Sequence, residues 1–397
     1  MAKVAILGFG TVGSGVYEVL CTNAEGIAKR AGKPLEVGYI LDIRDFPGHP
    51  AERLFTKNFD DILNDSEVTV VAEVIGGVKV AYEFTKKALS AGKHVVTSNK
   101  ELVATHGAEL LKLAEENGVS YLFEASVGGG IPIIHPLHQC LAANEISEIF
   151  GILNGTTNYI LTQMIKNGES FESALKNAQQ LGYAEANPAA DVEGIDACRK
   201  ISILASLAFG RQLNADKIYT EGITKVTLTD VEYAEKLSAV IKLIGYCKRD
   251  GDKVFARVSP MIVPKESALS GVDDVFNAIL VRGNAIGDAM FYGKGAGKLP
   301  TASAVVSDII DAAVGTNRRI MWKDEGDSFM ADIADSEAKW FIKTAEENAC
   351  EVEKLFGIVE KVKVAEGEFG FVSPKASEKE LLEKVNAISA SYIRILE

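Results

Sequence analysis

The chain has 397 residues, of which 47% are hydrophobic and 24% are charged. A chain of this length usually forms two or three domains, because a single core rarely grows beyond about 250–300 residues. The composition is that of a folded globular protein and excludes a disordered one. The net charge is -13, from 55 acidic and 42 basic residues. Since no run of basic residues occurs, we do not expect a nucleic-acid partner.

The cysteines and the first residues indicate the compartment. The five cysteines are scattered along the chain and include no CxxC pair. Such isolated thiols are typical of cytoplasmic proteins rather than of disulfide frameworks or zinc sites. The N-terminal residues lack the order of a secretory signal, and no uninterrupted apolar run reaches the roughly 18 residues of a membrane span. We therefore expect a cytoplasmic protein without a membrane segment.

Residues 1–132 alternate apolar strands with helices. The predicted strands are KVAILG, LEVGYILD, VTVVAEVIG, HVVTSN and SYLFEAS. A helix is predicted over residues 12–30, and two more end at glycines, in VAYEFTKKALSAG and GAELLKLAEENG. Buried strands that alternate with helices form parallel sheets with right-handed crossovers. The pattern predicts an α/β domain with a Rossmann-type, doubly wound parallel sheet.

Residues 133–297 have a different pattern. Strands are predicted for ISEIFGILN, VFARVSPMIV and VFNAILVRG, and longer helices for YILTQMIKNG, ACRKISILASLAFG and DVEYAEKLSAVIKLIG. Strands in runs beside a helical layer predict an α+β domain. The next helix, PTASAVVSDIIDAAVG, is rich in small residues. We expect this helix, within residues 298–320, to return to the first domain.

Residues 335–397 form a predicted C-terminal module. Strands are expected for KWFIKTA, IVEKVKVA, GEFGFVS and SYIRILE, and helices for CEVEKLFG and EKELLEKVNAI. The resulting order, β-α-β-β-α-β, is that of a small ferredoxin-like fold.

A glycine-rich motif follows the first strand. Gly8-Phe9-Gly10-Thr11-Val12-Gly13 matches GxGxxG between a strand and a helix, which is the context that dinucleotide binding requires. The first glycine permits the tight turn, the second lets the pyrophosphate approach the backbone, and the third lets helix and strand pack closely. The pyrophosphate then lies at the positive end of the helix. The motif predicts a nicotinamide dinucleotide cofactor for hydride transfer.

The residues expected at the adenosine ribose leave the choice of cofactor open. Asp42 closes the second strand and Arg44 follows it. An aspartate at this place favours NAD, whereas an arginine can hold the 2′-phosphate of NADP.

Acidic residues and a lysine are concentrated between residues 178 and 200. The stretch AQQLGYAEANPAADVEGIDACRK contains Glu185, Asp191, Glu193, Asp196 and Lys200. If a helix begins near residue 195, Asp196 and Lys200 share one face of it. A carboxylate beside an ammonium in a cleft provides both an amine-binding group and an acid. The alternative is an ordinary solvated pair at the start of a helix, which contributes little.

This stretch resembles a known family. It is similar to the homoserine dehydrogenase signature at every fixed position. Four further blocks resemble conserved segments of the family, in the family's order: SNK at 98–100, EASVGGGIP at 124–132, GILNGTTN at 151–158 and GKGAG at 293–297. The resemblance covers residues 1–320. It implies an NAD(P)-dependent, reversible reduction of L-aspartate 4-semialdehyde to L-homoserine, a step in the biosynthesis of threonine, methionine and isoleucine.

The resemblance also implies roles for individual residues. Lys200 would be the catalytic acid/base, and Lys100 a second cation beside the substrate or the nicotinamide. An ammonium can stabilise the charge that develops on the aldehyde oxygen and deliver its proton. Glu185 and Asp196 would hold the α-ammonium of the substrate, with Asp191 orienting them.

Further positions complete the implied site. Gly182 would supply backbone contacts to the substrate, and Asn154 and Thr156 would face the substrate or the nicotinamide. Ser98 and Gly297 would join Lys100 in contacting the cofactor.

The resemblance further implies a monovalent cation and an assembly. Sodium or potassium would be held by the Glu124 carboxylate and backbone carbonyls of Val127, Gly129 and Ile131, since hard cations prefer oxygen ligands. The alternative is that Glu124 pairs with a neighbouring amide or lysine. A homodimer, or a higher homo-oligomer, is expected by resemblance and because two-fold symmetry is common.

The C-terminal module resembles, more loosely, an ACT regulatory domain. It lacks the usual aspartate-proline-glycine loop after its first strand, where this chain has AEENACEVEK. Effector binding, for example of threonine, and a structural or dimerising role therefore both stay open.

Two other functions compete with this prediction. A related Rossmann oxidoreductase for another small semialdehyde or hydroxy acid would keep the glycine motif without the ammonium site. A non-catalytic sensor of dinucleotide and amino acid would not need Lys100 or Lys200. A zinc site at His135, His138 and Cys140 is not predicted, because no further ligand cluster accompanies them.

Overall fold

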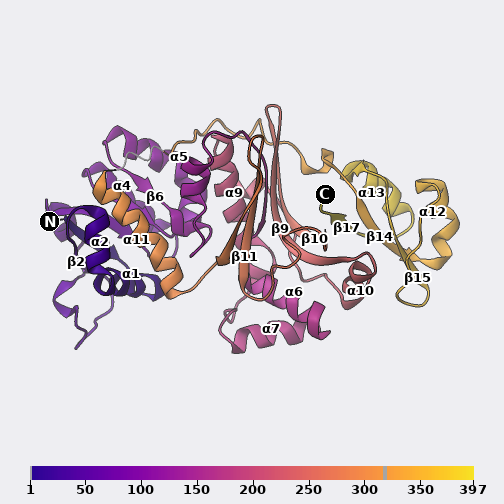
Figure 1. Cartoon of the computed structure of the whole chain (residues 1–397), viewed down its shortest axis with the longest axis horizontal. Helices are drawn as coiled ribbons and strands as arrows, with labels where there is room; N and C mark the ends of the chain where they lie inside the picture. The colour runs from indigo at the N-terminus through magenta and orange to yellow at the C-terminus, as the bar shows by residue number, and fades with distance from the viewer. Residues whose placement is uncertain (1, 316–319) are drawn as a thin grey trace. The chain divides into compact units, whose positions relative to one another are not determined.

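The computed structural model describes residues 2–315 and 320–397, and these form two compact units (Figure 1). The nucleotide unit consists of Met1–Glu145, Ser202–Ala215 and Phe291–Asp327. The sheet unit consists of Ile146–Ile201, Asp216–Met290 and Ser328–Glu397.

The nucleotide unit is built on a six-stranded parallel sheet in the order β3-β2-β1-β4-β5-β6. Its strands are β1 (Ala2–Leu7), β2 (Leu35–Leu41), β3 (Phe55–Thr56), β4 (Val68–Glu73), β5 (His94–Thr97) and β6 (Tyr121–Leu122). The central strands are buried on both faces, as expected of a parallel sheet covered by helices. The predicted Rossmann-type sheet is confirmed.

Helices cover this sheet: α1 (Thr11–Thr22), α2 (Ala24–Ala31), α3 (Phe59–Asn64), α4 (Lys79–Ser90), α5 (Lys100–Glu116) and α11 (Lys298–Val314). The prediction of one helix over residues 12–30 is wrong, because the chain breaks at Asn23 into α1 and α2. α11 lies against α1 and α2 (Figure 1). A Cβ on Gly15 would come within 2.8 Å of the Lys298 carbonyl oxygen, so this contact requires glycine. Residues 316–319 of the predicted 298–320 segment lie outside the described residues.

The sheet unit is built on a nine-stranded mixed sheet in the order β12-β11-β7-β9-β10-β17-β14-β15, with β8 also paired to β10. The strands are β7 (Ile146–Ile152), β8 (Tyr219–Thr220), β9 (Ala239–Asp250), β10 (Lys253–Pro264), β11 (Phe276–Gly283), β12 (Gly287–Lys294), β14 (Trp340–Ala345), β15 (Glu368–Val372) and β17 (Ser391–Ile395). The short strands β13 (Glu337–Ala338) and β16 (Ala376–Ser377) pair separately. This mixed sheet with helices confirms the predicted α+β class.

The helices of this unit are α6 (Gly155–Asn167), α7 (Phe171–Gln180), α8 (Ala189–Val192), α9 (Ile195–Phe209), α10 (Leu228–Lys236), α12 (Ala349–Phe356) and α13 (Glu378–Ala387). α9 begins in the sheet unit and ends in the nucleotide unit. The predicted helix DVEYAEKLSAVIKLIG is wrong in its second half. Ser238 adopts a φ of +53°, which ends the helical stretch, and β9 starts at the next residue.

The C-terminal elements run β14, α12, β15, α13 and β17. The predicted strand IVEKVKVA is wrong, because this segment makes only one isolated bridge, between Val362 and Gly370. β17 pairs in parallel with β10 and antiparallel with β14, so the C-terminal strands extend the large sheet. Trp340, Phe369 and Phe371 form part of their buried core. Among the described residues, no helix combines the length and the apolar composition that crossing a membrane requires.

Candidate active site

The glycine motif forms the turn between β1 and α1. Gly8 has a φ of +93°, and a Cβ on Gly13 would lie 1.9 Å from the Gly8 carbonyl oxygen. These two glycines therefore permit the turn and the close packing of helix on strand. A Cβ on Gly10 would meet nothing within 4 Å, and no side chain caps the start of α1. The first turn of α1 thus presents backbone N–H groups to open space, which fits a pyrophosphate.

Asp42 and Arg44 lie next to this turn. The Phe9 amide donates to Asp42 Oδ2 over 2.7 Å, and the Arg44 guanidinium donates to both carboxylate oxygens at 2.9–3.0 Å. The hydrogen bonds from Arg44 outweigh partial burial and lower the pKa of Asp42 to about 2. Asp42 is nearly buried, whereas the Arg44 side chain is 57% exposed. A cavity of about 360 Å³ beside them is also lined by Lys57.

A polar network that the sequence analysis missed joins the carboxyl ends of β4 and β5. Thr97 Oγ1 donates to Glu73 Oε2 over 2.6 Å, and the Ile75 amide donates to Oε1 over 2.7 Å. Thr97 Oγ1 in turn accepts from the Asn99 amide, and Asn99 Nδ2 donates to the carbonyls of Ile75 and Gly77. Glu73 is fully buried, and burial raises its pKa to about 7.

This network positions the start of α5. The Asn99 side chain caps the helix by accepting from the Leu102 amide over 3.1 Å, so Lys100 is the first helical residue. Ser98 and Lys100 therefore lie at the carboxyl edge of the parallel sheet, where ligands of doubly wound folds bind. A single acidic residue in the apolar run VTVVAEVIG was the signal that could have identified Glu73.

The predicted acid–lysine pair is buried in the sheet unit. α9 begins at Ile195, as expected, and places Asp196 and Lys200 on one face. Lys200 Nζ lies 2.8 Å from Asp196 Oδ2 and donates to the Leu153 carbonyl over 2.7 Å. Only 10% of the Lys200 side chain and 9% of the Asp196 side chain are exposed. A solvated surface pair is therefore excluded.

Asn154 connects this pair to Asp191. Its Nδ2 donates to Asp191 Oδ1 over 2.7 Å and to Asp196 Oδ2 over 3.0 Å, while its Oδ1 caps α6. Thr156 Oγ1 donates to the Tyr183 carbonyl over 2.7 Å, which ties the start of α6 to the loop before α8. Asn154 at the start of α6 thus joins two carboxylates and one ammonium, which come from α8 and from the start of α9.

Gly182 and Glu185 lie on the exposed loop between α7 and α8. Gly182 has a φ of +75°, which explains a glycine there. The backbone carbonyl of Glu185 accepts from Gln179 Nε2 over 3.1 Å. Within the described chain, the Glu185 carboxylate has no hydrogen bond or ion pair, so the structure does not join it to the cluster around Lys200.

Glu124 is buried in the nucleotide unit and accepts three backbone N–H groups. The amides of Ile133 and Ile134 donate to Oε1, and the amide of His135 donates to Oε2, at 2.6–2.8 Å. The expected alternative, pairing with neighbouring amides, is therefore present. Val127–Ile131 form a tight turn in which the Ile131 amide donates to the Gly128 carbonyl. Among described residues, no three His, Cys, Asp or Glu side chains gather as metal ligands.

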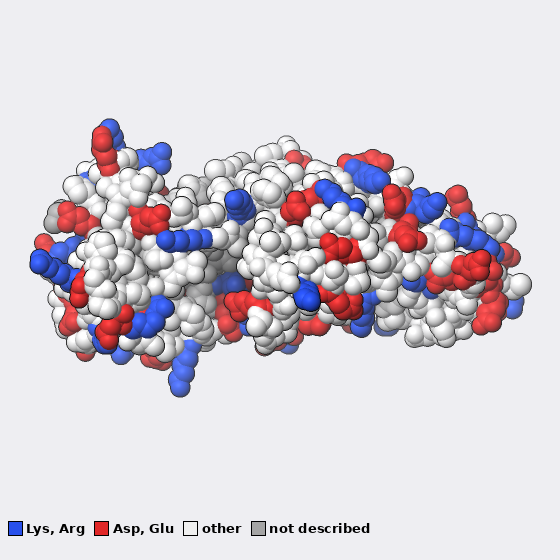
Figure 2. Space-filling view, turned by 90° about the horizontal axis from the view of Figure 1, so that it is seen from below, with Lys and Arg blue, Asp and Glu red and all other residues white. Residues whose placement is uncertain are grey.

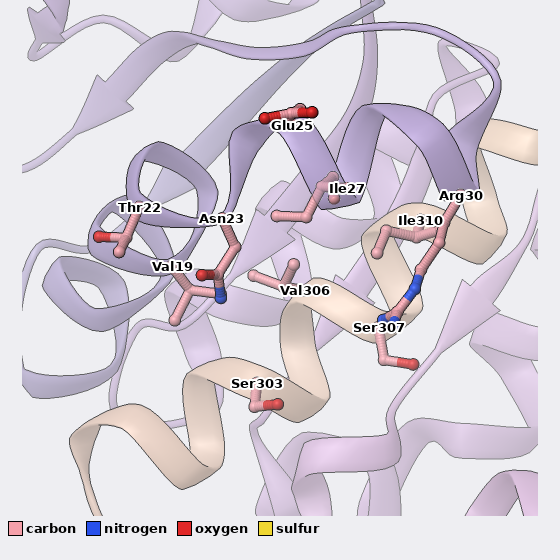
Figure 3. A pocket seen from close by; sticks show the side chains of 11 residues that line it. Val19, Thr22, Asn23, Glu25, Ile27, Arg30, Ser303, Val306, Ser307 and Ile310 are labelled. Atoms are coloured by element: carbon pink, nitrogen blue, oxygen red, sulfur yellow. The ribbon is translucent and has the colours of Figure 1, made fainter.

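Three further features of the structure are Gly297, the groove beside α2 and the charged surface. The prediction that Gly297 contacts the cofactor stays a prediction. Gly297, at a φ of +125°, immediately precedes α11. A groove of about 560 Å³ is lined by side chains from α1, α2 and α11 (Figure 3). It borders the last turn of α1, so it is not the place where the glycine turn would bind a pyrophosphate. On the face that Figure 2 shows, acidic and basic side chains are interspersed and mark no single-sign surface.

The fold and these residues define a class of protein. The strand order 3-2-1-4-5-6, an open glycine turn before α1 and a buried lysine–carboxylate pair are those of a Rossmann-type, NAD(P)-dependent oxidoreductase.

Comparison with known proteins identifies the family. Residues 8–124 match the model of the homoserine dehydrogenase NAD-binding domain, and residues 132–310 match the homoserine dehydrogenase model. The chain belongs to the homoserine dehydrogenase family. It is 47% identical over 310 residues to homoserine dehydrogenase of Pseudomonas aeruginosa, an alignment that covers 78% of this chain and 71% of the relative.

Solved structures of homoserine dehydrogenases are similar to the chain, in one case along its whole length. A homoserine dehydrogenase from Thiobacillus denitrificans has a TM-score of 0.92 at 35% identity, with 100% of this chain and 98% of that chain covered. A hyperthermophilic archaeal homoserine dehydrogenase in complex with NADPH has a TM-score of 0.66 at 28% identity, covering 79% of this chain and 98% of that chain.

Proposed function

We propose that the chain catalyses its family's reaction, the NAD(P)-dependent interconversion of L-aspartate 4-semialdehyde and L-homoserine, with Lys200 as the acid/base residue. The observation that carries this assignment is the buried pair of Lys200 and Asp196, 2.8 Å apart. A lysine held in a nearly dry site beside a carboxylate is the arrangement expected of a positioned proton donor.

The hydrogen bonds of Lys200 support this role. An ammonium has three donors. One donates to the Leu153 carbonyl and one to Asp196, which leaves one N–H without a partner among the described residues. That N–H is available to the aldehyde oxygen, which becomes negative as the cofactor delivers hydride to the carbon. In the direction of oxidation, the neutral amine form of Lys200 would accept the proton of the homoserine hydroxyl and become the ammonium.

Asp191 and Asp196 support binding of the substrate's ammonium group. Asn154 donates to one oxygen of each carboxylate and so holds the two acidic side chains next to each other. We propose that this pair holds the α-ammonium, and that Glu185 and Gly182 approach the substrate from the α7–α8 loop. In the nucleotide unit, Lys100 and Ser98 are proposed to contact the nicotinamide portion.

We further propose that NADP is accepted, with Arg44 contacting its 2′-phosphate. Arg44 and Lys57 both line the cavity beside the glycine turn, and Asp42 already accepts from Phe9 and Arg44. The NADPH complex of the archaeal relative supports the same choice.

Oxidation of L-homoserine tests this function directly. The purified chain is mixed with homoserine and either NAD or NADP in parallel, and absorbance of the reduced nicotinamide is followed. We expect turnover with homoserine and a larger kcat/KM with NADP. No turnover with either cofactor, in folded protein supplied with sodium and potassium, would instead support a sensor or an enzyme for another semialdehyde.

A monovalent cation, sodium or potassium, is proposed near Glu124 with the carbonyls of Val127, Gly129 and Ile131. A carboxylate offers about four acceptor positions, so three donated amides leave capacity for a cation. Activity in potassium or sodium chloride should exceed activity in choline chloride at equal ionic strength. Equal activity in all three salts would contradict a cation requirement.

A homodimer and a cytoplasmic location complete the proposal. β12 is the edge strand of the nine-stranded sheet, and Met290 and Tyr292 on it are 41% and 52% exposed. Such an apolar edge favours pairing with a second copy. Light scattering coupled to size exclusion should give twice the mass of the chain. All five cysteines are free, which fits a reducing compartment.

A further inference from the structure

A second polar cavity lies within the sheet unit, away from the residues around Lys200. It has a volume of about 300 Å³ and lies among β8, β10, α10, β14 and β17. Two arginines and a lysine contribute to its wall, together with three aromatic side chains: Lys225, Arg257, Arg394, Tyr219, Trp340 and Tyr392. None of the residues that line it belongs to the Asp191, Asp196 and Lys200 cluster.

The two arginines differ in how their charges are compensated. Arg257 is 2% exposed and forms an ion pair with the buried Glu378 over 3.1 Å, and its Nε donates to Ser259. Arg394 is 5% exposed and forms no ion pair with any described residue. Its Nη2 donates to the carbonyl and hydroxyl oxygens of Ser336.

In the part of the chain that the structure describes, the second terminal nitrogen of the Arg394 guanidinium, Nη1, has no hydrogen-bond partner. Nη1 is buried and makes no hydrogen bond within the described chain. The guanidinium also stacks on the Trp340 ring, 5.1 Å from its centroid, which fixes its plane. A buried charge without a counter-ion is costly, and proteins normally pair it or hydrogen-bond every donor. Of these two buried guanidinium groups, only Arg257 has an ion-pair partner among the described residues, the Glu378 carboxylate.

The other acidic groups near Arg394 have cationic or hydroxyl partners of their own. Glu397, whose charge favours that of Arg394, forms ion pairs with Lys339 and Lys375. Asp230 is engaged by Lys343 at 2.8 Å and caps α10, and Glu221 accepts from the Tyr219 hydroxyl. Burial and the nearby Arg257 lower the pKa of Arg394 to about 10, so the guanidinium is still charged at neutral pH. The cavity is thus positively charged at its buried end.

We propose that this cavity binds a small oxyanion, a carboxylate or a phosphate, with Arg394 as its principal ligand and Arg257 and Lys225 beside it. Guanidinium groups bind such anions through parallel, charge-assisted hydrogen bonds. The volume is at the lower end of the range for small-molecule sites, so the ligand has few non-hydrogen atoms. This site is separate from the dehydrogenase reaction and does not depend on it.

Calorimetric titration of the full chain tests the proposal, with malonate and inorganic phosphate as probes and sodium chloride at matched ionic strength as the reference. We expect saturable binding of at least one probe and a rise in the melting temperature that chloride does not produce. Binding of malonate alone assigns a carboxylate ligand, and binding of phosphate alone assigns a phosphate. The absence of binding by both probes overturns the proposal.

Variants locate the bound probe. Arg394→Met keeps the volume of the side chain and should weaken binding at least tenfold. Arg282→Met removes an arginine that is fully ion-paired elsewhere on the sheet, to Glu148 and Asp288, and should leave binding unchanged. Lys200→Met should also bind normally. Loss of binding in Lys200→Met, or unchanged binding in Arg394→Met, overturns the assignment.

Melting temperatures show whether a loss of binding in Arg394→Met comes from misfolding. Without anions, Arg394→Met should melt no lower than the unmodified chain, because it removes an uncompensated buried charge. In saturating probe, the order should reverse. If Arg394→Met does not fold, the exposed Lys225→Met is used, and it should weaken binding at least twofold. Unchanged affinity in that variant would then contradict the site.

Discussion

The two units bury their key carboxylates in different surroundings. Glu73, at the end of β4, is fully buried, and among the described residues it accepts hydrogen bonds only from Thr97 and the Ile75 amide. Asp196, in α9, is also buried but faces the Lys200 ammonium at 2.8 Å. The first arrangement raises the pKa of the carboxyl group to about 7, because no cation offsets burial. The second arrangement is an ion pair, in which each buried charge is compensated by the other.

This difference separates a carboxyl group that is buried without a cation, and whose pKa is about 7, from a carboxylate that is buried in contact with an ammonium. A neutral Glu73 can hold the backbone at the carboxyl edge of the sheet through hydrogen bonds without adding a negative charge there. A compensated lysine suits a place where a proton must be delivered to a developing negative charge. Substitutions at the Asp196–Lys200 pair should therefore change turnover and stability, whereas substitution of Glu73 should change how stability depends on pH.

Removing the ammonium should have the largest effect. Lys200→Ala takes away the proposed proton donor and leaves Asp196 buried without a cation. We expect kcat to fall by about a thousandfold or more, and the free energy of unfolding by about 3–5 kcal/mol. Steady-state kinetics, urea unfolding and binding of reduced nicotinamide followed by fluorescence measure these effects. Cofactor binding should be retained.

Lys200→Arg separates the two roles of the lysine, as counter-ion of Asp196 and as acid/base residue. Arginine keeps a counter-ion for Asp196 but does not give up a proton near neutral pH. We expect it to recover most of the stability and little of the turnover. Exchange of the exposed Lys236 for alanine is the matched control and should change neither. Near-normal turnover in Lys200→Arg would contradict the acid/base role.

Removing only the negative charge should cost less. Asp196→Asn keeps a side chain of similar shape but leaves Lys200 without its ion-pair partner. We expect kcat/KM for homoserine to fall about a hundredfold, consistent with the loss of one partner of a buried pair. The exposed Glu193→Gln, in the same stretch, is the control and should keep full activity. An equal loss of kcat/KM in both variants would mean that activity depends on the overall negative charge of this stretch and not on the pair of Asp196 and Lys200.

The buried Glu73 should make the stability of the protein depend on pH. The folded protein holds a proton on Glu73 up to about pH 7, whereas an ordinary glutamate loses it near 4.5. The folded state thus binds more protons between these values, and stability falls as pH rises from about 4.5 to 7. By linkage, about 2.5 units at about 1.36 kcal/mol each give a loss of about 3 kcal/mol above pH 7.

Glu73→Gln should remove this pH dependence. The amide imitates the protonated acid, so at pH 8 the variant should be more stable than the unmodified chain, and at pH 4.5 the two should be similar. Urea unfolding at several pH values measures the difference. Glu36→Gln, an exposed acid on β2, should leave the pH profile as it is. A glutamine variant that keeps the original pH slope would show that other groups cause it.

The sequence predicts the nucleotide unit better than the sheet unit, for a physical reason. Parallel strands buried on both faces are uninterrupted apolar runs, and glycines mark the turns between them. In DVEYAEKLSAVIKLIG the apolar residues fit a helix as well as a strand. Only the left-handed backbone at Ser238 and pairing with distant strands decide that its second half is β9.

The sequence also predicts the candidate site only in part. Spacing places Asp196 and Lys200 on one helical face, but it does not predict that the Leu153 carbonyl and Asn154, from another part of the chain, complete the site. The contact between Glu73 and Thr97 is likewise made only when β4 and β5 pair. Local spacing predicts which residues can meet, while tertiary pairing decides which do.

The smallest effect on stability is expected at the pair of Arg44 and Asp42, because the Asp42 side chain is nearly buried but the Arg44 side chain is 57% exposed to solvent. Arg44→Gln should lower the free energy of unfolding by no more than about 1 kcal/mol, because exposed ion pairs contribute little. Its effect should appear in cofactor choice: KM for NADP should rise about tenfold, as expected for loss of one charge-assisted contact, while KM for NAD stays within about twofold. Kinetics with both cofactors at fixed homoserine measure this ratio, with the exposed Arg53→Gln as control. Equal losses with NAD and NADP would place Arg44 at a part of the cofactor that both share, and would leave the 2′-phosphate to another cation such as Lys57.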